Sequence, residues 1–289
     1  MLPNAIFWEN LKDHEFTEAV EKSKGVCVIP IGAMEKHGPH MPVGTDNMIA
    51  RETARLAAMK EPVVLFPEFS FGNISGLQYL KGSICLSNQL ILNYLDELCQ
   101  EIARSGFNKI LFLNAHGGNN SMLTTFCNSM REKKRDYVVM YANSFRTTIE
   151  DLQKAITQRQ EDFPEITQED EDILHRYFQE VTSSGHADYD ELLLLYELLP
   201  ETVDISLMGM ESGENNHRTD HLSKVGIFSG GMWLANFPNS YAASYFPHIN
   251  HRLSKAYLQL RVEYIAKIFK TSKEDQTLLE INEEWNHSW

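Results

Sequence analysis

Continuous apolar runs and amphipathic segments alternate along this chain of 289 residues. The continuous runs predict strands buried on both faces, because such strands need no polar side; they lie at residues 26–31, 63–67, 109–113 and 137–141. The segments between them carry apolar residues at helical spacing, most clearly at 88–105. The repeated order of strand and helix predicts parallel strands joined by right-handed crossovers. We therefore expect an α/β fold, a three-layer α/β/α sandwich with a mostly parallel central sheet.

One domain is expected to hold residues 1–289, and an amphipathic helix at 253–268 is the last strong element. Residues 147–184 are helical in pattern and strongly acidic, which predicts a peripheral insertion or lid. Residues 205–247 are rich in glycine and asparagine and are expected to form a long loop. An acidic tail at 271–289 is expected to be partly ordered.

The charge balance excludes some classes of partner. The chain has 40 acidic and 26 basic residues, a formal net charge of −14, which argues against general nucleic-acid binding and against docking on an anionic membrane. No basic-then-apolar leader opens the sequence, and no apolar run approaches the length of a membrane span. The four cysteines are widely spaced and predict no disulfide framework. We expect a cytoplasmic protein that binds neither nucleic acid nor membrane.

The first candidate site follows the strand at 26–31. Glu35 and His37 are two residues apart, so in an extended segment their side chains point the same way. A Gly-Pro turn then allows Asp46, at the start of the next helix, to return to the same place. Two carboxylates and one imidazole suit zinc, manganese or iron(II) better than calcium or magnesium. For this segment alone, a polar turn with solvated charges is the alternative.

His116 follows the strand at 109–113, within a glycine-rich turn that opens another helix. Because parallel strands end at one edge of a sheet, His116 can meet the first cluster there. A phosphate-binding loop is the alternative, but the G-x-x-x-x-G-K pattern is absent. A third cluster contains His186 and Glu191, the latter at a helix start that favours a carboxylate. For the nearby Asp188 and Asp190 we prefer a simple helix-end charge without a further role.

Together these segments resemble the creatininase (creatinine amidohydrolase) family. Its E-x-H-G-P-H-L-P-x-x-T-D signature corresponds to residues 35–46, its N-G-H-G-G-N to 114–119 and its H-A-G-x-x-E-T-S to 186–193, in the same order. The resemblance implies a creatininase-like α/β/α hydrolase, usually a homohexamer, with two divalent metal ions per chain, either zinc, manganese or iron.

The resemblance also implies roles for single residues. Glu35 and His116 would hold one metal, His37 would help to hold the other, and Asp46 would bridge the two. Creatininase itself completes its second site with a glutamate two residues after the histidine that matches His116, where this chain has glycine. Glu191 is the expected replacement.

The expected function is therefore metal-dependent hydrolysis of a small cyclic amide or formamide, a carbon–nitrogen bond other than a peptide bond, by metal-activated water. An amide nitrogen must be protonated before it leaves, and a histidine has a suitable pKa for that task. His186 and Glu191 are thus the expected catalytic residues. Creatininase closes tryptophans over its substrate just before the histidine matching His186, and this chain has none between residues 145 and 185, so creatinine stays an open question.

Two other functions are weighed against hydrolysis. The missing second-site glutamate, and the loss of Thr-Ser after Glu191, motivate a non-catalytic protein that binds a small polar metabolite through a metal. A purely structural zinc site is less favoured, because such sites rarely use two carboxylates.

Overall fold

A parallel sheet of five strands lies at the centre of the computed structural model, which describes residues 6–288. The strand order is β1-β3-β2-β4-β5, and every neighbouring pair is parallel. The strands are β1 (Ile6–Phe7), β2 (Val26–Ile31), β3 (Val64–Leu65), β4 (Lys109–Asn114) and β5 (Val138–Asn143). The longest pairings join β2 to β4 and β4 to β5 over their full lengths, so the centre of the sheet is its most regular part.

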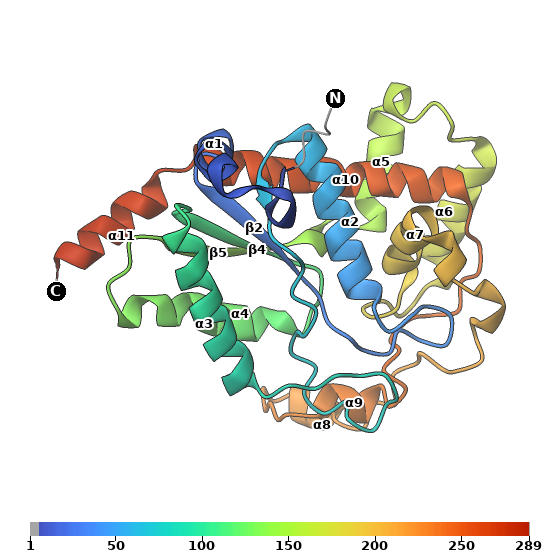
Figure 1. Ribbon diagram of the computed structural model, residues 1–289. Helices are drawn as coiled ribbons and strands as arrows, with labels where there is room; N and C mark the ends of the chain where they lie inside the picture. The colour runs from blue at the N-terminus through green and yellow to red at the C-terminus, as the bar shows by residue number, and fades with distance from the viewer. Residues whose placement is uncertain (1–5, 289) are drawn as a thin grey trace.

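Helices cover both faces of this sheet (Figure 1). One face packs against α1 (Phe16–Lys22), α3 (Asn88–Arg104) and α4 (Asn119–Ser129), and the other against α2 (Thr45–Lys60) and α10 (His251–Glu274). Alternate residues of β2 explain the two cores, because successive side chains of a strand point to opposite faces. Cys27 and Ile29 join the first core, whereas Val26 and Val28 join the second. The predicted three-layer sandwich is confirmed.

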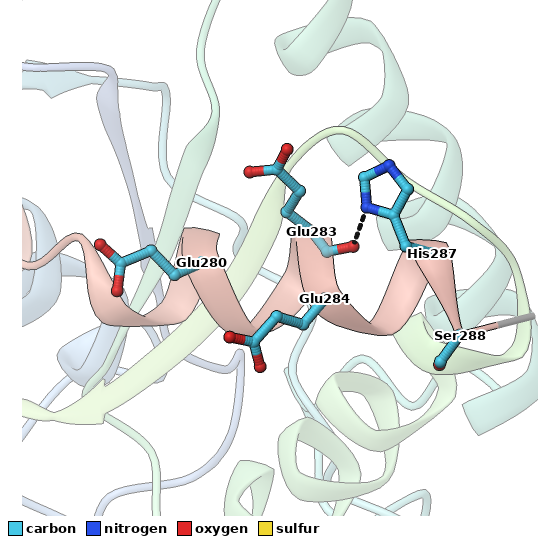
Figure 2. Close-up of a pocket in the computed structure, with 5 residues that line it drawn as sticks. All are labelled: Glu280, Glu283, Glu284, His287 and Ser288. Atoms are coloured by element: carbon cyan, nitrogen blue, oxygen red, sulfur yellow. Dashed lines mark hydrogen bonds between the residues drawn. The ribbon is translucent and has the colours of Figure 1, made fainter.

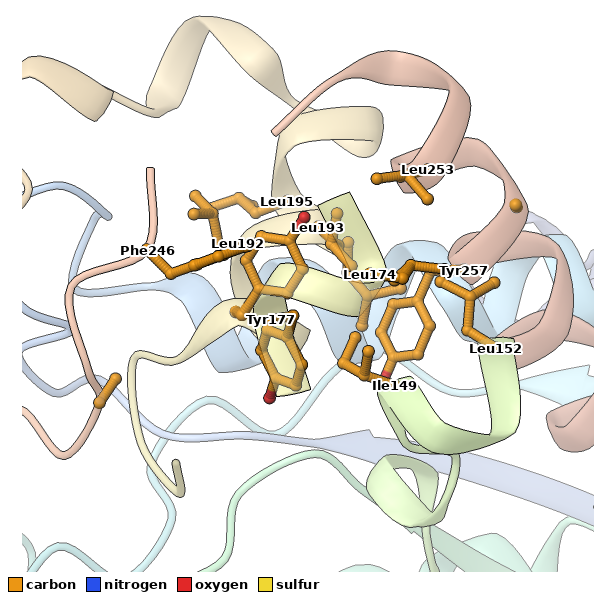
Figure 3. Close-up of a cluster of buried hydrophobic side chains, with 14 of the residues drawn as sticks. Ile149, Leu152, Leu174, Tyr177, Leu192, Leu193, Leu195, Phe246, Leu253 and Tyr257 are labelled. Carbon is orange, nitrogen blue, oxygen red and sulfur yellow. The ribbon is translucent and has the colours of Figure 1, made fainter. Parts of the chain in front are cut away.

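A third apolar cluster joins α5 (Ile149–Gln158), α6 (Gln168–Glu180) and α7 (Tyr189–Leu198) to α10, as Figure 3 shows. Residues 147–184 are helical as expected, but Leu152 and Leu174 are almost fully buried in this cluster. The segment thus contributes to the core instead of only covering it. Its acidic run also contacts the rest of the protein, since the buried Asp170 accepts a hydrogen bond of 2.7 Å from Arg252 Nε of α10.

The remaining segments are more ordered than their composition indicated. The stretch 205–247 contains the short helices α8 (Asp220–Ser223) and α9 (Met232–Asn236), and α11 (Thr277–His287) follows α10. Residues 271–288 are therefore largely helical, and residue 289 lies outside the described part. Short 3-10 helices occur at Trp8–Asn10, Asp13–Glu15, Met130–Glu132, Ser144–Arg146, Gln160–Asp162, Pro200–Thr202 and Ile205–Leu207. Within residues 6–288, no helix has both the length and the apolar composition needed to cross a bilayer.

A buried lysine joins the sheet to the end of α10. Lys109, the first residue of β4, is 1% exposed. Its ammonium donates to the carbonyls of Ser272 and Lys273, both at 3.2 Å, and to the carbonyl of Asp275. The carboxyl end of a helix carries partial negative charge, so this contact compensates the buried cation. α10 is consequently fixed at this end to the sheet and elsewhere to α2 and α7.

Candidate metal centre

The loop after β2 folds back on itself at the carboxyl edge of the sheet. Gly38 has a φ of +60°, a left-handed conformation that glycine adopts readily. His37 and Met41 form an antiparallel bridge across the turn, and Glu35 N donates to Val43 O at 3.0 Å. α2 then starts at Thr45, which places Asp46 in its first turn. The predicted return of the chain is what the structure shows.

Side chains from three segments converge at this edge. Asp46 Oδ2 lies 3.0 Å from His116 Nδ1, and the same nitrogen is 2.8 Å from Glu35 Oε1. The other oxygen of Asp46, Oδ1, lies 3.1 Å from His37 Nε2, which is 3.8 Å from Glu191 Oε2. Two sets, Glu35-Asp46-His116 and His37-Asp46-Glu191, therefore share the carboxylate of Asp46, and within each set the potential ligand atoms lie within 4.8 Å of one another.

In each histidine of the cluster, the ring nitrogen that points away from the carboxylates contacts a backbone carbonyl oxygen; we call it the outer nitrogen and the other the inner nitrogen. In the neutral ring the outer nitrogen carries the proton, so the inner nitrogen presents a lone pair to the cluster. The outer contacts are His37 Nδ1 to Glu35 O at 3.0 Å, His116 Nε2 to Asn73 O at 3.0 Å and His186 Nε2 to Lys36 O at 2.9 Å. Histidines that bind metals are oriented in this way.

The residues present fit a divalent cation. Glu35 Oε1 and Asp46 Oδ2 are buried and have no hydrogen-bond partner among the described residues other than the close approach of His116 Nδ1, at 2.8 and 3.0 Å. Buried carboxylate oxygens without a partner are unfavourable. Without a metal only protons can compensate them: burial opposes a charged ring, yet Glu35 and Asp46 raise the pKa of His116 well above its ordinary value. Burial also opposes a charged ring at His37. The nearby carboxylates, chiefly that of Asp46, outweigh this effect and raise the pKa of His37 to about 10.

Glu191 is the accessible member of the cluster. Its side chain is 23% exposed, whereas the side chain of His186 is 10% exposed and that of Asp46 only 1%. Its Oε2 accepts a hydrogen bond of 2.7 Å from Ala187 N, which orients the carboxylate. Burial raises the pKa of Glu191 to about 8, despite the opposing effect of His37.

His186 lies beside Glu35 and His37. Its Nδ1 is 3.7 Å from Glu35 Oε1, and burial lowers its pKa. Together with Glu35 and His37 it forms a third set whose potential ligand atoms lie within 4.8 Å of one another. From this position His186 could either transfer a proton or bind a metal.

A cavity of about 210 Å³ adjoins Glu191. It is lined by residues after β4 and β5, at the start of α7, and on α2 and α10; they are Ile49, Ala115, Gly117, Ser144, Phe145, Gly185, Asp188, Asp190, Glu191, Leu194 and Arg261. A larger hollow of about 550 Å³ lies on α11, but its side chains extend outward from that single helix without converging (Figure 2). Of these two, the cavity at Glu191 is the one that borders the cluster, through Glu191 itself.

Three residues near the centre were not predicted from the sequence. Trp233 of α9 contacts His186 edge to face, with ring centroids 5.5 Å apart, so a tryptophan reaches the site from the glycine-rich stretch after all. Arg261 of α10 lines the cavity. Asp190, expected to be a simple helix-end charge, accepts a hydrogen bond of 2.7 Å from Tyr257 Oη, and burial raises its pKa to about 7. Asp188 does cap α7, by accepting from Glu191 N.

A family model described as creatinine amidohydrolase matches residues 9–244. Among curated proteins, a mycofactocin precursor peptide peptidase of Mycobacterium tuberculosis (strain CDC 1551 / Oshkosh) is 33% identical over 119 residues, covering 38% of this chain and 47% of that protein. A 2-amino-5-formylamino-6-ribosylaminopyrimidin-4(3H)-one 5'-monophosphate deformylase of Methanococcus maripaludis (strain C7 / ATCC BAA-1331) is 31% identical over 104 residues, 34% of this chain and 44% of that protein. The matched segments span about half the length of these relatives.

Solved creatininases share the fold over almost the whole chain. A mutant creatininase superposes with a TM-score of 0.71 at 18% identity, covering 94% of this chain and 100% of that one. A creatininase described with Mn gives a TM-score of 0.70 at 19% identity with the same coverage, and a mutant of a Zn-Zn type gives 0.69 at 17%, covering 94% and 99%. Since the family model covers most of the residues and the three segments occur in family order, the chain belongs to the creatininase family.

Proposed function

We propose that this protein is a dinuclear-metal hydrolase of a small cyclic amide or formamide. The observation that carries the proposal is the shared carboxylate of Asp46, which faces two separate sets of ligand atoms. Glu35, Asp46 and His116 would hold one divalent ion, and His37, Asp46 and Glu191 the other. Carboxylate and imidazole ligands suit zinc, manganese and iron(II).

The reaction replaces the amide C–N bond by a C–O bond to water, with one proton from water delivered to the leaving nitrogen. When bound, the metal pair supplies an ionised water near neutral pH and polarises the carbonyl group. His186 has its Nε2 proton fixed on Lys36 O, so its Nδ1 is the atom that accepts and donates a proton beside Glu35. A positioned imidazole that protonates the amine allows an otherwise poor leaving group to depart.

The size of the cavity favours a small substrate. Its volume of about 210 Å³ lies below the roughly 300–1,000 Å³ of typical drug-sized ligand sites. A formamide is also the bond that the methanogen relative is named for, although only 104 residues match. A peptide bond is the bond named for the mycobacterial relative, so dipeptides belong in any test.

Metal analysis and an activity panel test the proposal together. Metal-free protein would be loaded with zinc, manganese or iron(II), its metal content measured, and each form assayed on cyclic amides, N-formyl compounds, lactones and dipeptides. We expect two metals per chain and turnover of a cyclic amide or a formamide. Fewer than two metals at saturation, together with no turnover, would instead support the metal-dependent binding protein.

We also propose a homohexamer, which the family resemblance supports. Light scattering at micromolar protein concentration should give about six times the chain mass, and a monomeric mass would refute the assembly. A cytoplasmic location stays a prediction.

A further inference from the structure

A buried arginine without an ion pair lines the cavity beside Glu191. Arg261 is 2% exposed, and its guanidinium donates only to neutral oxygens. Nε donates to the Thr147 hydroxyl, and Nη2 donates to the Thr147 carbonyl at 3.3 Å and to the Tyr257 hydroxyl at 2.7 Å. Across residues 6–288, no carboxylate forms an ion pair with Arg261, and Nη1 has no hydrogen-bond acceptor.

Three other cations with largely buried side chains, at Arg135, Lys273 and Lys109, each have a negatively charged partner or a helix end. Arg135 Nη2 lies 2.6 Å from Asp96 Oδ1, and Lys273 Nζ lies 2.6 Å from Glu61 Oε1. Lys109 donates to the carbonyls at the end of α10. A guanidinium cannot lose its proton in a protein, so burial without an anion is strongly unfavourable. Arg261 therefore differs from these cations, because no carboxylate among the described residues contacts its guanidinium directly.

Acidic side chains line the same cavity, but none of them forms an ion pair with Arg261. Asp188 accepts a hydrogen bond of 2.6 Å from the Ser184 hydroxyl and caps α7. Asp190 is joined to Arg261 by hydrogen bonds through the Tyr257 hydroxyl, which accepts from the guanidinium and donates to the carboxylate. Burial raises the pKa of Asp190, and the charge of Arg261 opposes that rise. Glu191 faces the candidate metal centre. Among the described residues that line this cavity, Arg261 is the only basic one.

We propose that Arg261 selects the substrate by binding its oxyanion, a carboxylate or a phosphate, while the scissile amide lies beside Glu191. Both residues line one cavity of about 210 Å³, so one small molecule can contact both. The substrate class is then an N-formyl or cyclic amide that bears an anionic group, not a neutral amide. The inference rests on the proposed function for the reacting end of the substrate, and on Arg261 for the anionic end.

N-formylglycine and N-formylglycinamide are matched probes, because the first carries a carboxylate where the second carries a neutral amide. Calorimetry on the zinc-loaded protein would give the affinity for each, and turnover would be measured in parallel. We expect N-formylglycine to bind roughly ten- to a hundredfold more tightly, the usual worth of a hydrogen bond to a charged group. Inorganic phosphate and acetate are then compared as competitors of N-formylglycine. If phosphate displaces N-formylglycine at a lower concentration than acetate does, the site favours a phosphate; the reverse order indicates a carboxylate.

The variants separate selection from structure. Arg261→Gln should remove the preference while metal content stays at two per chain, and Arg261→Lys, which keeps the charge, should retain part of it. Arg261→Lys also serves if Arg261→Gln does not fold. Arg135→Gln removes another arginine whose side chain is only 8% exposed but does not line the cavity, and it should leave the preference unchanged.

Equal affinity for the two probes in the native protein would overturn the inference. A preference that survives Arg261→Gln would do the same, because it would place the carboxylate on the metals. Failure of the proposed function looks different: the preference for N-formylglycine would persist in calorimetry without turnover of any amide. Turnover without a preference for N-formylglycine would support the proposed hydrolase and contradict the role of Arg261.

Discussion

The imidazole rings of His37 and His186 lie 4.4 Å apart, centroid to centroid, and are inclined by 49°. Consecutive carbonyls of one loop orient them, since His37 Nδ1 contacts Glu35 O and His186 Nε2 contacts Lys36 O. The inner nitrogens point to different places: His37 Nε2 lies between Asp46 and Glu191, and His186 Nδ1 faces Glu35. We therefore propose different tasks for the two rings.

Replacement of His186 tests its proposed task. If His186 moves the proton, His186→Ala should keep both metals and the substrate affinity, and should lose roughly 10²–10⁴-fold in kcat. Metal analysis and steady-state kinetics measure both quantities. Glu191→Ala is the matched comparison, because it should lose the second metal and the activity together. Metal loss in His186→Ala would make the residue a ligand, and an unchanged kcat would leave it without a role in the reaction.

Replacement of Asp46 tests whether its carboxylate is shared. Asp46→Ala should remove both metals, because each of its oxygens lies beside a different histidine. His37→Ala should chiefly weaken one metal, since His37 belongs with Asp46 and Glu191 only in the second set. Metal content at graded free-zinc concentrations measures the difference. Full metal content in Asp46→Ala would show that no metal depends on the shared carboxylate.

Metal binding should release protons and strengthen as the pH rises. In the metal-free protein the pKa of His37 is raised to about 10 and that of Glu191 to about 8, so both groups are protonated near neutral pH. Metal ligands must be deprotonated, so protons compete with the metal and the affinity falls as the pH falls. Calorimetry of zinc binding in two buffers with different ionisation enthalpies counts the protons released. Identical heats in both buffers would contradict this linkage.

Asp170 should stabilise the fold at neutral pH and lose this effect in acid. Burial alone would raise its pKa, but hydrogen bonds from Arg252, Thr167 and Asn250 hold the pKa below its ordinary value. A carboxyl group with a depressed folded pKa contributes stability above its unfolded pKa, near 4, and loses it as the pH falls through the folded pKa. Asp170→Asn should therefore cost about 1–3 kcal/mol near neutral pH and progressively less below about pH 4.

Urea unfolding at several pH values measures this difference. The control is Glu169→Gln, which removes an exposed carboxylate 3.0 Å from the same Arg252. An exposed ion pair contributes roughly 0–1 kcal/mol, so this variant should change little at any pH. An equal effect of both substitutions, or a loss for Asp170→Asn that does not depend on pH, would contradict the prediction.

Much of the fold and of the first cluster was predictable because the signals are local. Val26 to Ile31 form a continuous apolar run, and the glycine turn at Gly38 brings Glu35, His37 and the first turn of α2 together within a short loop. The meeting with His116 followed from one general property, that parallel strands end at the same edge of a sheet.

Arg261 and Trp233 could not be predicted in this way. Arg261 lies on α10, which contacts both α2 and α7. Because a helix that packs against two neighbours is buried over more than one face, its sequence pattern does not show that this charged residue is buried. Trp233 lies in α9, whose five residues are too few to show a helical period. Asp190 and Tyr257 meet only because α7 and α10 pack side by side. Such contacts depend on tertiary packing and leave no local pattern.

The contact of Lys109 with the end of α10 limits how far the protein can be shortened. A truncation before Ser272 would leave the buried ammonium of Lys109, at the start of β4, with none of its present acceptors. α11, in contrast, has no buried residue among those described, and touches Arg135 O through Asn282 at 2.8 Å and Asn286 at 2.6 Å. The last turn of α10 is thus a folding requirement of the sheet, and the practical boundary for a truncated variant or an affinity tag lies after Asp275.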